Sequence, residues 1–418
     1  MQYRSSVLLN FIKTFLTKYT LYDIIYKEYL YKEVITTIRR VRIRIFPTKE
    51  QENILYKHIG CCRFIWNYML TEHNEVYKNE NKFMSCYDMS KLITCLKKEK
   101  YPWLKDVSSY SLSMICRDLE KAFVKFYNKD CKFPKYKSKK KARKSFPVRS
   151  DIKRLYFKNN FIKIEKIGKI TYKNIGDKYK DIIKKSQGFH DARIYYINNK
   201  WILSIGIDYE NQVVELTDKS LGIDLGIKEL AVCSFGGEKL VFHNINKTKR
   251  IKNLESKLKH IQRVVSRKYK ANENYGKTNS IIKYENIMRD ICYKMSCIRE
   301  NYIHQTTHYL ISLLPYKVVM ENLSVSDMIK NKHLAKEIQE QCFYKFISQM
   351  KYKCEEYGIE FIQTDRFYPS SKTCSCCGNI KKDLKLSDRI YKCNECGLII
   401  DRDFNAALNL EKYVVNQK

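Results

Sequence analysis

The sequence lacks any long hydrophobic run, which argues against a membrane protein. Its apolar N-terminal stretch, residues 6–16, is too short for a membrane span, is interrupted by Lys13 and carries no small-residue cleavage site. We therefore expect neither a signal peptide nor a membrane partner. Residues 1–38 are expected to form an extension appended to the folded part of the chain.

The sequence is also poor in acidic residues. It has 45 Asp and Glu against 80 Lys and Arg, and its formal net charge is +35. Neutralising phosphates releases their counterions, so a nucleic acid is the expected partner; a basic surface that is simply solvated is the alternative. With 418 residues and a hydrophobic content of 44%, the chain can build two or three folded units.

Solenoid-type repeats and a disulfide framework are both missing. The 16 cysteines are spread over a long, Lys-rich chain, which favours a reducing, intracellular location. In a bacterial or archaeal host this would be the cytoplasm and nucleoid. In a eukaryotic or viral host it would be the nucleus, with Lys137–Lys144 as a candidate nuclear signal. A monomer is the default expectation.

Four cysteines near the C-terminus have the spacing of a zinc site. They form two CxxC pairs separated by fifteen residues: Cys374, Cys377, Cys393 and Cys396. Gly378 and Gly397 directly follow the two pairs, whereas Cys376 has no partner in the pattern. Because four thiolates complete the tetrahedral coordination of Zn²⁺, we expect a structural zinc site. The basic residues between the pairs would contact phosphate or only face solvent: Lys381, Lys382, Lys385 and Arg389.

The N-terminal half has the pattern of a β unit with helices inserted in it. Alternating basic and apolar residues predict a strand from Arg40 to Phe46, and a capping box from Thr48 to Gln51 predicts the start of a helix. Further helices are predicted through Leu96 and over Ser111–Tyr127, before strand-like segments follow. Three aromatic residues lie beside the basic segment Lys137–Lys144: Phe133, Tyr136 and Phe146. They could stack on bases or pack in a core, and core packing is the commoner role.

A second unit is predicted to begin near Ser220. Residues 221–235 predict two buried strands joined by a tight glycine turn, and residues 249–314 are charged and helical in pattern. A buried strand beginning near Val318, a strand over residues 359–365, the cysteine cluster and a closing helix complete the chain. The expected fold class is α/β plus β.

Three carboxylates stand where burial alone would select an apolar residue. Asp224 lies inside an apolar strand, Glu321 ends another, and Asp403 heads the closing helix. A buried carboxylate is costly unless it is paired or binds a cation, so these acids predict a Mg²⁺ or Mn²⁺ site. Two ions about 3.5–4 Å apart would activate a water for attack on a phosphodiester. The alternatives are a turn around Asp224, a lysine partner for Glu321, and a helix cap for Asp403.

The order of motifs along residues 39–412 adds a family resemblance. The motifs are RIFPTKEQ, GCCRFIWNYML, YPWLKDVSSYSL, FPKYKSKK, GIDLGIKELAVCS, VVMENLSV, DRFYPSSKTCSCCGN and CGLIIDRDFNAALNL. Together they resemble the TnpB (OrfB) family of transposon-encoded nucleases, which is related to Fanzor proteins and to type V CRISPR effectors.

The resemblance implies two domains. Residues 39–219 would form a wedge domain, a β-barrel that carries a helical recognition insert at about residues 48–130. Residues 220–418 would form a RuvC-like nuclease domain of RNase H fold, with the zinc ribbon inserted at about residues 370–400.

The resemblance also implies an RNA-guided DNA endonuclease of a transposable element. Its partners would be a guide RNA and the double-stranded target DNA with which that RNA pairs. Asp224, Glu321 and Asp403 match the three magnesium-binding RuvC acids; Asp403 is favoured over Asp401 because it stands directly before the xNAA motif, with Asn405 in support. Other matched positions would contact the scissile strand or orient the zinc knuckle: Arg366, Ser370, Ser371, Lys372 and Arg402.

Two further functions remain open. A nuclease-silent, RNA-guided DNA-binding repressor would usually have lost a RuvC acid, and none is lost here. An unguided transposase or resolvase of RNase H fold would share the metal chemistry without needing the N-terminal β unit. A tyrosine transposase is disfavoured because no His-x-His motif accompanies the many tyrosines.

Overall fold

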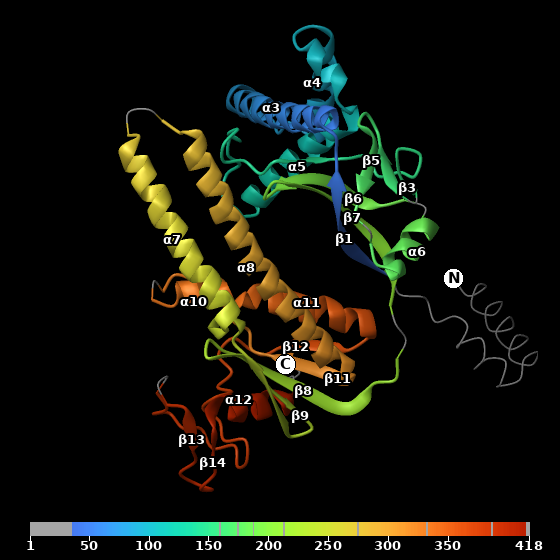
Figure 1. Ribbon diagram of the computed structural model, residues 1–418. Helices are drawn as coiled ribbons and strands as arrows, with labels where there is room; N and C mark the ends of the chain where they lie inside the picture. The colour runs from blue at the N-terminus through green and yellow to red at the C-terminus, as the bar shows by residue number, and fades with distance from the viewer. Residues whose placement is uncertain are drawn as a thin grey trace, which may run out of the picture.

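Two β-sheets form two lobes, and a pair of long helices extends from one lobe toward the other (Figure 1). The computed structural model describes residues 36–414, apart from residues 159, 174, 187, 212–213, 274–275, 332 and 386–387. Most of the predicted extension, residues 1–35, therefore lies outside the described residues. Within the described part, no helix has the length and apolar character required to cross a membrane.

The first lobe contains a seven-stranded antiparallel sheet in the order β2-β6-β7-β1-β5-β4-β3. The strands are β1 (Thr36–Phe46), β2 (Ser145–Pro147), β3 (Leu155–Lys158), β4 (Phe161–Ile164), β5 (Gly168–Tyr172), β6 (His190–Ile197) and β7 (Lys200–Glu210). Within the described residues no ladder joins the edge strands β2 and β3, so the expected closed barrel stays a prediction.

β1 begins four residues before the predicted strand because Thr36 to Arg39 pair with β7. Its central residues alternate as period-2 patterning requires: Val41, Ile43 and Ile45 are buried, and the arginines between them are exposed. This strand therefore contributes alternate residues to the core of the sheet while presenting arginines on its other side.

Three α-helices lie between β1 and β2 in the chain: α3 (Lys49–Glu80), α4 (Cys86–Lys98) and α5 (Ser109–Tyr127). The predicted capping box is confirmed, since Thr48 Oγ1 accepts from the Gln51 amide at 3.3 Å and Gln51 Oε1 accepts from the Thr48 amide at 3.0 Å. The chain thus leaves the first sheet after β1, forms the helices, and returns to the same sheet at β2. A short helix, α6 (Asp177–Lys185), follows β5.

The second lobe contains a five-stranded sheet in the order β10-β9-β8-β11-β12. β10, β9 and β8 are antiparallel, whereas β8, β11 and β12 are parallel. The strands are β8 (Thr217–Leu225), β9 (Glu229–Phe235), β10 (Glu238–His243), β11 (Pro315–Met320) and β12 (Glu360–Gln363). The two strands predicted within residues 221–235 and the strand predicted near Val318 are confirmed.

Helices cover both faces of the second sheet (Figure 1). Leu221 and Ile223 of β8 pack in a core with side chains of α8 (Asn279–Ser312) and α11 (Phe343–Tyr357). The closing helix α12 (Arg402–Glu411) contacts β8 on the opposite face. Because side chains alternate along a strand, residues 222 and 224 face α12.

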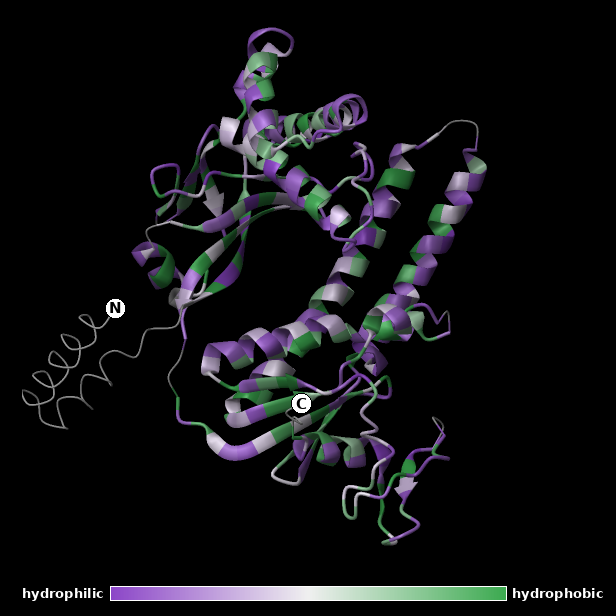
Figure 2. Cartoon of the chain, turned by 180° about the vertical axis from the view of Figure 1, so that it is seen from behind, coloured by the Kyte–Doolittle hydropathy of each residue, from purple (hydrophilic) through white to green (hydrophobic). Residues whose placement is uncertain are grey.

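The region predicted to be helical over residues 249–314 forms two antiparallel helices, α7 (Lys249–Ala271) and α8. Hydrophilic and hydrophobic residues alternate along both helices in Figure 2. In the described part of this pair, a small core built around Ile251, Ile291 and Met295 lies between the helices. Two short helices follow β11: α9 (Val325–Met328) and α10 (Ala335–Gln341).

Candidate active site and zinc ribbon

Asp224 and Glu321 are neighbours across two parallel strands. Ile223 of β8 pairs with Met320 of β11, so the next residue along each chain is an acid at the carboxyl end of the strand. Ile223 and Met320 point into the core shared with α8 and α11. The two acids therefore lie on the α12 side of the sheet, as the alternation of side chains requires.

α12 runs antiparallel to β8 and brings Asp403 toward Asp224. The Glu411 carbonyl accepts a 2.6 Å hydrogen bond from Ser220 Oγ, and the backbone of Ala407 packs on Gly222. Residue 411 of the helix thus lies at residue 220 of the strand, and residue 407 lies at residue 222. Four residues earlier in the helix and two residues later in the strand, Asp403, in the first turn of α12, comes opposite Asp224.

The electrostatics agree with this placement. Burial raises the pKa of Asp224 well above its usual value, and the charges of Glu321 and Asp403 raise it further. Burial also raises the pKa of Glu321, although the hydrogen bond from Ser370 and the charge of Arg402 act in the opposite direction. The negative charges of Glu321 and Asp403 thus disfavour the ionisation of Asp224, and a bound cation would relieve that repulsion.

Asp401 and Asp403 have different partners. The Asp401 carboxylate caps α12 by accepting a 2.9 Å hydrogen bond from the Phe404 amide, and it lies 3.5 Å from Lys239 Nζ. Asp403 Oδ1 instead accepts from the Arg402 guanidinium at 3.2 Å. The charge of Asp403 also acts more strongly than that of Asp401 on the pKa of Asp224.

The local structure contradicts the three alternative roles for these acids. Asp224 lies inside β8 and not in a turn, and the cap of α12 is Asp401 rather than Asp403. Glu321 accepts from the hydroxyl of Ser370, and no lysine in the described part of the chain forms an ion pair with it. None of these three roles therefore explains why acids stand at positions 224, 321 and 403.

The four cysteines meet at one point. Their sulfur atoms all lie within 4.8 Å of one another, with 3.6 Å between Cys374 and Cys396 and 3.5 Å between Cys377 and Cys393. Tetrahedral Zn²⁺ with Zn–S bonds of about 2.3 Å requires sulfur separations of roughly 3.8 Å. The donor set and its spacing therefore fit zinc. Among the described residues, no other group of three or more potential ligands is gathered this closely, so the acids are more widely spread than the sulfurs.

The backbone around the two CxxC pairs turns tightly after each pair and donates hydrogen bonds to a cysteine sulfur. Gly378 and Gly397 adopt φ angles of 78° and 71°, a region that favours glycine. Hydrogen bonds from the backbone at Cys396 and Glu395 lower the pKa of the Cys393 thiol to about 6, which favours the thiolate form that binds metal. Cys376 is exposed and lies outside the cluster.

The ribbon is built directly onto α12. Its small sheet pairs β13 (Ile390–Lys392) with β14 (Ile399–Asp401), and α12 begins at the next residue. The buried Asn405 side chain accepts from the Ser375 amide at 3.0 Å and donates to the Thr373 carbonyl at 2.7 Å. Two further anchors were not predicted from the sequence: Asn409 on this helix and Lys412 directly after it. Asparagines four residues apart on an otherwise apolar helix face were the available signal.

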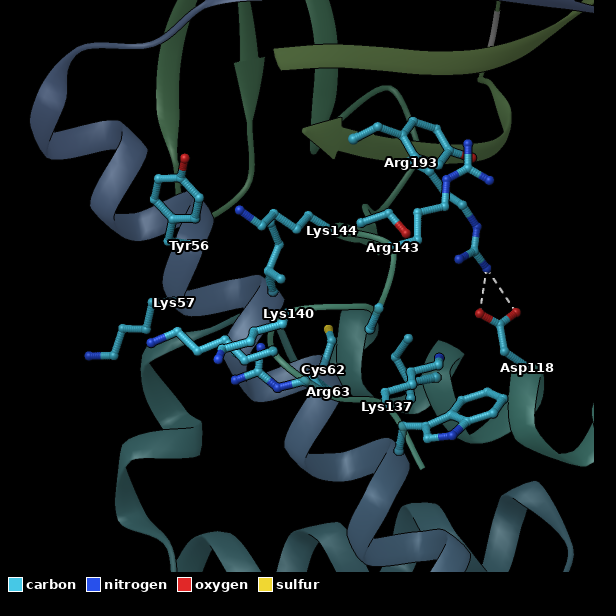
Figure 3. A pocket seen from close by; sticks show the side chains of 18 of the residues that line it. Tyr56, Lys57, Cys62, Arg63, Asp118, Lys137, Lys140, Arg143, Lys144 and Arg193 are labelled. Atoms are coloured by element: carbon cyan, nitrogen blue, oxygen red, sulfur yellow. Dashed lines mark hydrogen bonds and ion pairs between the residues drawn. The ribbon is translucent and has the colours of Figure 1, made fainter. Parts of the chain in front are cut away.

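A large basic cavity lies between the first sheet, helix α3 and the end of the α7–α8 pair that reaches toward the first lobe (Figure 3). Its volume is about 1700 Å³, and its lining has nine Lys and Arg residues against one acid, Asp118. Arg193 neutralises that acid through two hydrogen bonds of 2.8 and 2.6 Å. The lining lysines and arginines are Lys57, Arg63, Lys137, Lys139, Lys140, Arg143, Lys144, Arg193 and Lys277.

The basic segment Lys137–Lys144 is attached to α3 through Lys137, its first residue. Lys137 Nζ lies 3.2 Å from the ring centroid of Trp66, and burial lowers its pKa to about 8. Asn67 holds the Lys137 backbone through hydrogen bonds of 2.7 and 3.0 Å. Of the three aromatic residues beside this segment, Phe146 is fully buried and stacks on His58, which confirms core packing. The other two, Phe133 and Tyr136, are exposed.

Comparison with known proteins identifies the family. A "Probable transposase" model of the OrfB type matches residues 204–332, a "Cas12f1-like, TNB domain" model matches residues 343–410, and a "Helix-turn-helix domain" model of the OrfB type matches residues 37–82. A Streptomyces pristinaespiralis protein, named as a candidate RNA-guided DNA endonuclease, is 30% identical over 89% of this chain and 88% of its own length. The chain belongs to the TnpB (OrfB) family.

Other TnpB-family matches agree with this result. Escherichia coli K12 InsQ, also named as a candidate RNA-guided DNA endonuclease, is 28% identical over 89% of this chain and 91% of its own length. A solved Cas12f1–sgRNA–target DNA complex has the same fold, with a TM-score of 0.57 and 14% identity over 90% of this chain and 99% of that chain. In this TnpB-family protein, residues 37–82 form β1 and the single long helix α3 rather than a helix-turn-helix.

Proposed function

We propose that the protein is an RNA-guided DNA endonuclease of a transposable element and that it cuts by metal-dependent hydrolysis at Asp224, Glu321 and Asp403. The single observation that carries the metal-dependent part is the convergence of the three half-buried acids, from β8, β11 and α12, on the α12 side of the sheet. The strand order, with three antiparallel strands followed by two parallel ones, supports an RNase H-like fold of the RuvC type.

The residues present fit two divalent cations. Carboxylate oxygens are the ligands that Mg²⁺ and Mn²⁺ prefer. Two-metal sites hold their ions about 3.5–4 Å apart between shared carboxylates. When bound, the ions supply Lewis-acid activation of water and neutralise charge on the phosphate.

The chain's own residues have three tasks at this site. The carboxylates of Asp224, Glu321 and Asp403 hold the cations and fix where the phosphate can enter. Arg402, whose side chain is 14% exposed, donates to Asp403 and limits the directions in which that carboxylate can turn. Ser370 similarly donates to Glu321 and holds one of its two oxygens.

The basic cavity supports binding of a nucleic acid at the first lobe. Its lysines and arginines would neutralise backbone phosphates, and lining aromatic residues such as Tyr56 and Tyr195 offer flat surfaces for bases or sugars. We propose that the guide RNA and the target DNA occupy the space between the lobes, with the phosphodiester to be cut at the acids of the second lobe.

Expression together with the flanking DNA of its own gene tests this function. RNA that copurifies would be sequenced, and a plasmid matching its 3′ end beside a randomised motif would be offered with Mg²⁺. We expect one discrete RNA and matched cutting that Asp224→Ala abolishes. A discrete RNA with tight binding and no cutting would favour the silent repressor. Metal-dependent cutting without RNA would favour an unguided nuclease of the transposase or resolvase type.

A further inference from the structure

Ser370 is the point at which the zinc-ribbon segment contacts the acid site. Its hydroxyl donates to Glu321 Oε1, and its side chain is withdrawn from solvent, with 2% of the residue exposed. Its backbone amide donates to the Tyr368 carbonyl at 2.9 Å. A serine held this tightly has one direction in which to offer its hydroxyl, and that direction leads to the proposed metal ligand.

Helix α12 fixes the chain segment around Ser370 through hydrogen bonds from two of its asparagines. Asn409 Nδ2 donates at 2.7 Å to the carbonyls of both Ser370 and Thr373. One turn earlier, Asn405 also donates to the Thr373 carbonyl and accepts from the Ser375 amide. Cys374, a zinc ligand by its geometry, lies between Thr373 and Ser375. Only three residues of chain therefore separate Cys374 of the metal cluster from the serine that contacts Glu321.

A glutamate rotates about three side-chain bonds, and its carboxylate samples many positions unless a partner holds it. The serine hydroxyl holds one oxygen and leaves the other available to a cation. Partners that hold metal ligands in this way raise metal affinity, and their loss typically weakens affinity or activity by about 10–100-fold.

We propose that Ser370 is a positioning residue that orients Glu321 for cation binding, and that Asn405 and Asn409 make this orientation depend on an intact zinc ribbon. The inference rests on the proposed function, because it assumes that Glu321 binds the cation. In this arrangement the zinc site, which has no open coordination position for catalysis, sets the affinity of the acid site for its divalent cation.

Binding of Mn²⁺ to the zinc-loaded full chain, followed by electron paramagnetic resonance, tests the first part. We expect Ser370→Ala to raise the Mn²⁺ dissociation constant by about 10–100-fold and to raise the Mg²⁺ concentration that half-saturates cleavage. Zinc content should be unchanged. Ser111→Ala, which removes the hydroxyl of a similarly buried serine in the first lobe, is the matched control and should leave Mn²⁺ affinity as it is. A wild-type dissociation constant in Ser370→Ala would overturn the inference.

A second pair of variants tests the same inference if Ser370→Ala fails to fold. Ser370→Thr keeps the hydroxyl and Ser370→Val fills the same volume without it, so only the valine variant should lose Mn²⁺ affinity. Equal affinities in this pair would again overturn the inference. Asp224→Ala distinguishes a failure of this inference from a failure of the proposed function: if it too leaves Mn²⁺ binding unchanged, the proposed metal site itself is wrong.

A double-variant cycle tests the link to zinc. Cys396→Ser removes a thiol of the cluster, and we expect it to weaken Mn²⁺ binding in the wild-type background. In the Ser370→Ala background the same change should have little further effect, because both act through the orientation of Glu321. Fully additive effects, or no effect of Cys396→Ser alone, would contradict the coupling.

Discussion

Gly222 in β8 lies directly against the backbone of Ala407 in α12. A Cβ added at position 222 would stand 2.1 Å from the Ala407 carbonyl oxygen and 2.4 Å from the Glu411 amide nitrogen. Real Cβ atoms do not approach backbone this closely, so the absence of a side chain at position 222 lets α12 rest on the strand. The same helix carries Asp403, and this contact therefore sets the distance between two of the three acids.

Gly222→Ala is predicted to push α12 off the sheet. The obstructing atoms are backbone and cannot rotate away, so we expect a loss of about 3 kcal/mol or more in the free energy of unfolding. Divalent-cation binding should be lost with it. Urea unfolding and Mn²⁺ titration of the same sample would measure both effects.

Gly60→Ala is the matched control for that substitution. Gly60 lies inside α3 with nothing within 4 Å of the added Cβ, so alanine should stabilise the helix by about 1 kcal/mol. Unchanged stability in Gly222→Ala would show that α12 does not need the close approach.

Asp224→Asn is predicted to stabilise the protein in magnesium-free buffer while abolishing cleavage. Burial and two neighbouring acids raise the pKa of Asp224, so the folded state holds its proton more tightly than the unfolded state. Stability therefore falls as the pH rises above the unfolded pKa, and a neutral amide removes this loss. We expect a gain of about 1–3 kcal/mol. Added Mg²⁺ should raise the melting temperature of the wild type but not of the variant.

The Mg²⁺-dependent rise in melting temperature also decides whether Asp401 or Asp403 is the third metal ligand. Asparagine caps helices as well as aspartate does, so Asp401→Asn should keep the fold and the Mg²⁺-dependent rise in melting temperature. Asp403→Asn should lose that rise. The reverse pattern would identify Asp401 as the third ligand.

The sequence was informative wherever a local pattern determines the structure. The capping box at Thr48, the strands around Asp224 and Val318, and the cysteine spacing could all be read from neighbouring residues, because hydrogen bonds and side-chain alternation over a few positions create them. The cysteine pairs are the clearest case, since two short knuckles suffice to bring four sulfurs together.

Contacts between distant segments could not be read in this way. Nothing local to Gly222 indicates that α12 crosses it almost two hundred residues later, and nothing near Ser370 indicates its bond to Glu321. The first strand was predicted too short because its opening residues are ordered by pairing with β7. The register between parallel strands is a tertiary property, and it is what places Asp224 beside Glu321.

Cys377→Ser and Cys376→Ser form a pair of adjacent substitutions with opposite expected outcomes. Cys377 belongs to the four-sulfur cluster, so its loss should release zinc and unfold the ribbon, with increased proteolysis between residues 374 and 400. Cys376 is exposed and outside the cluster, so its variant should retain one zinc per chain. Metal analysis by mass spectrometry would measure both. Zinc retained after loss of Cys377 would contradict a four-cysteine site.

Two buried histidines on α3 are predicted to respond in opposite ways to the same substitution. His73 is 1% exposed and stacks on Phe123, and neither of its ring nitrogens has a hydrogen-bond partner among the described residues. His58 is equally buried, but its Nδ1 lies 2.9 Å from the Ile54 carbonyl and its Nε2 accepts from the Ser108 amide. We expect His73→Phe to stabilise the protein by about 1 kcal/mol and His58→Phe to destabilise it by about 1–3 kcal/mol.

The pH dependence of the same variants provides an independent measurement. Burial lowers the pKa of His73, so below a pH of about 6.5 the unfolded chain takes up a proton that the folded chain does not. Stability contributed by the neutral ring is therefore complete near neutral pH and is lost as the pH falls through the unfolded pKa. His73→Phe should remove this loss, making stability fall less steeply from pH 7 to pH 5 than in the wild type. Parallel unfolding curves for the two proteins across that range would show that His73 is protonated equally in both states.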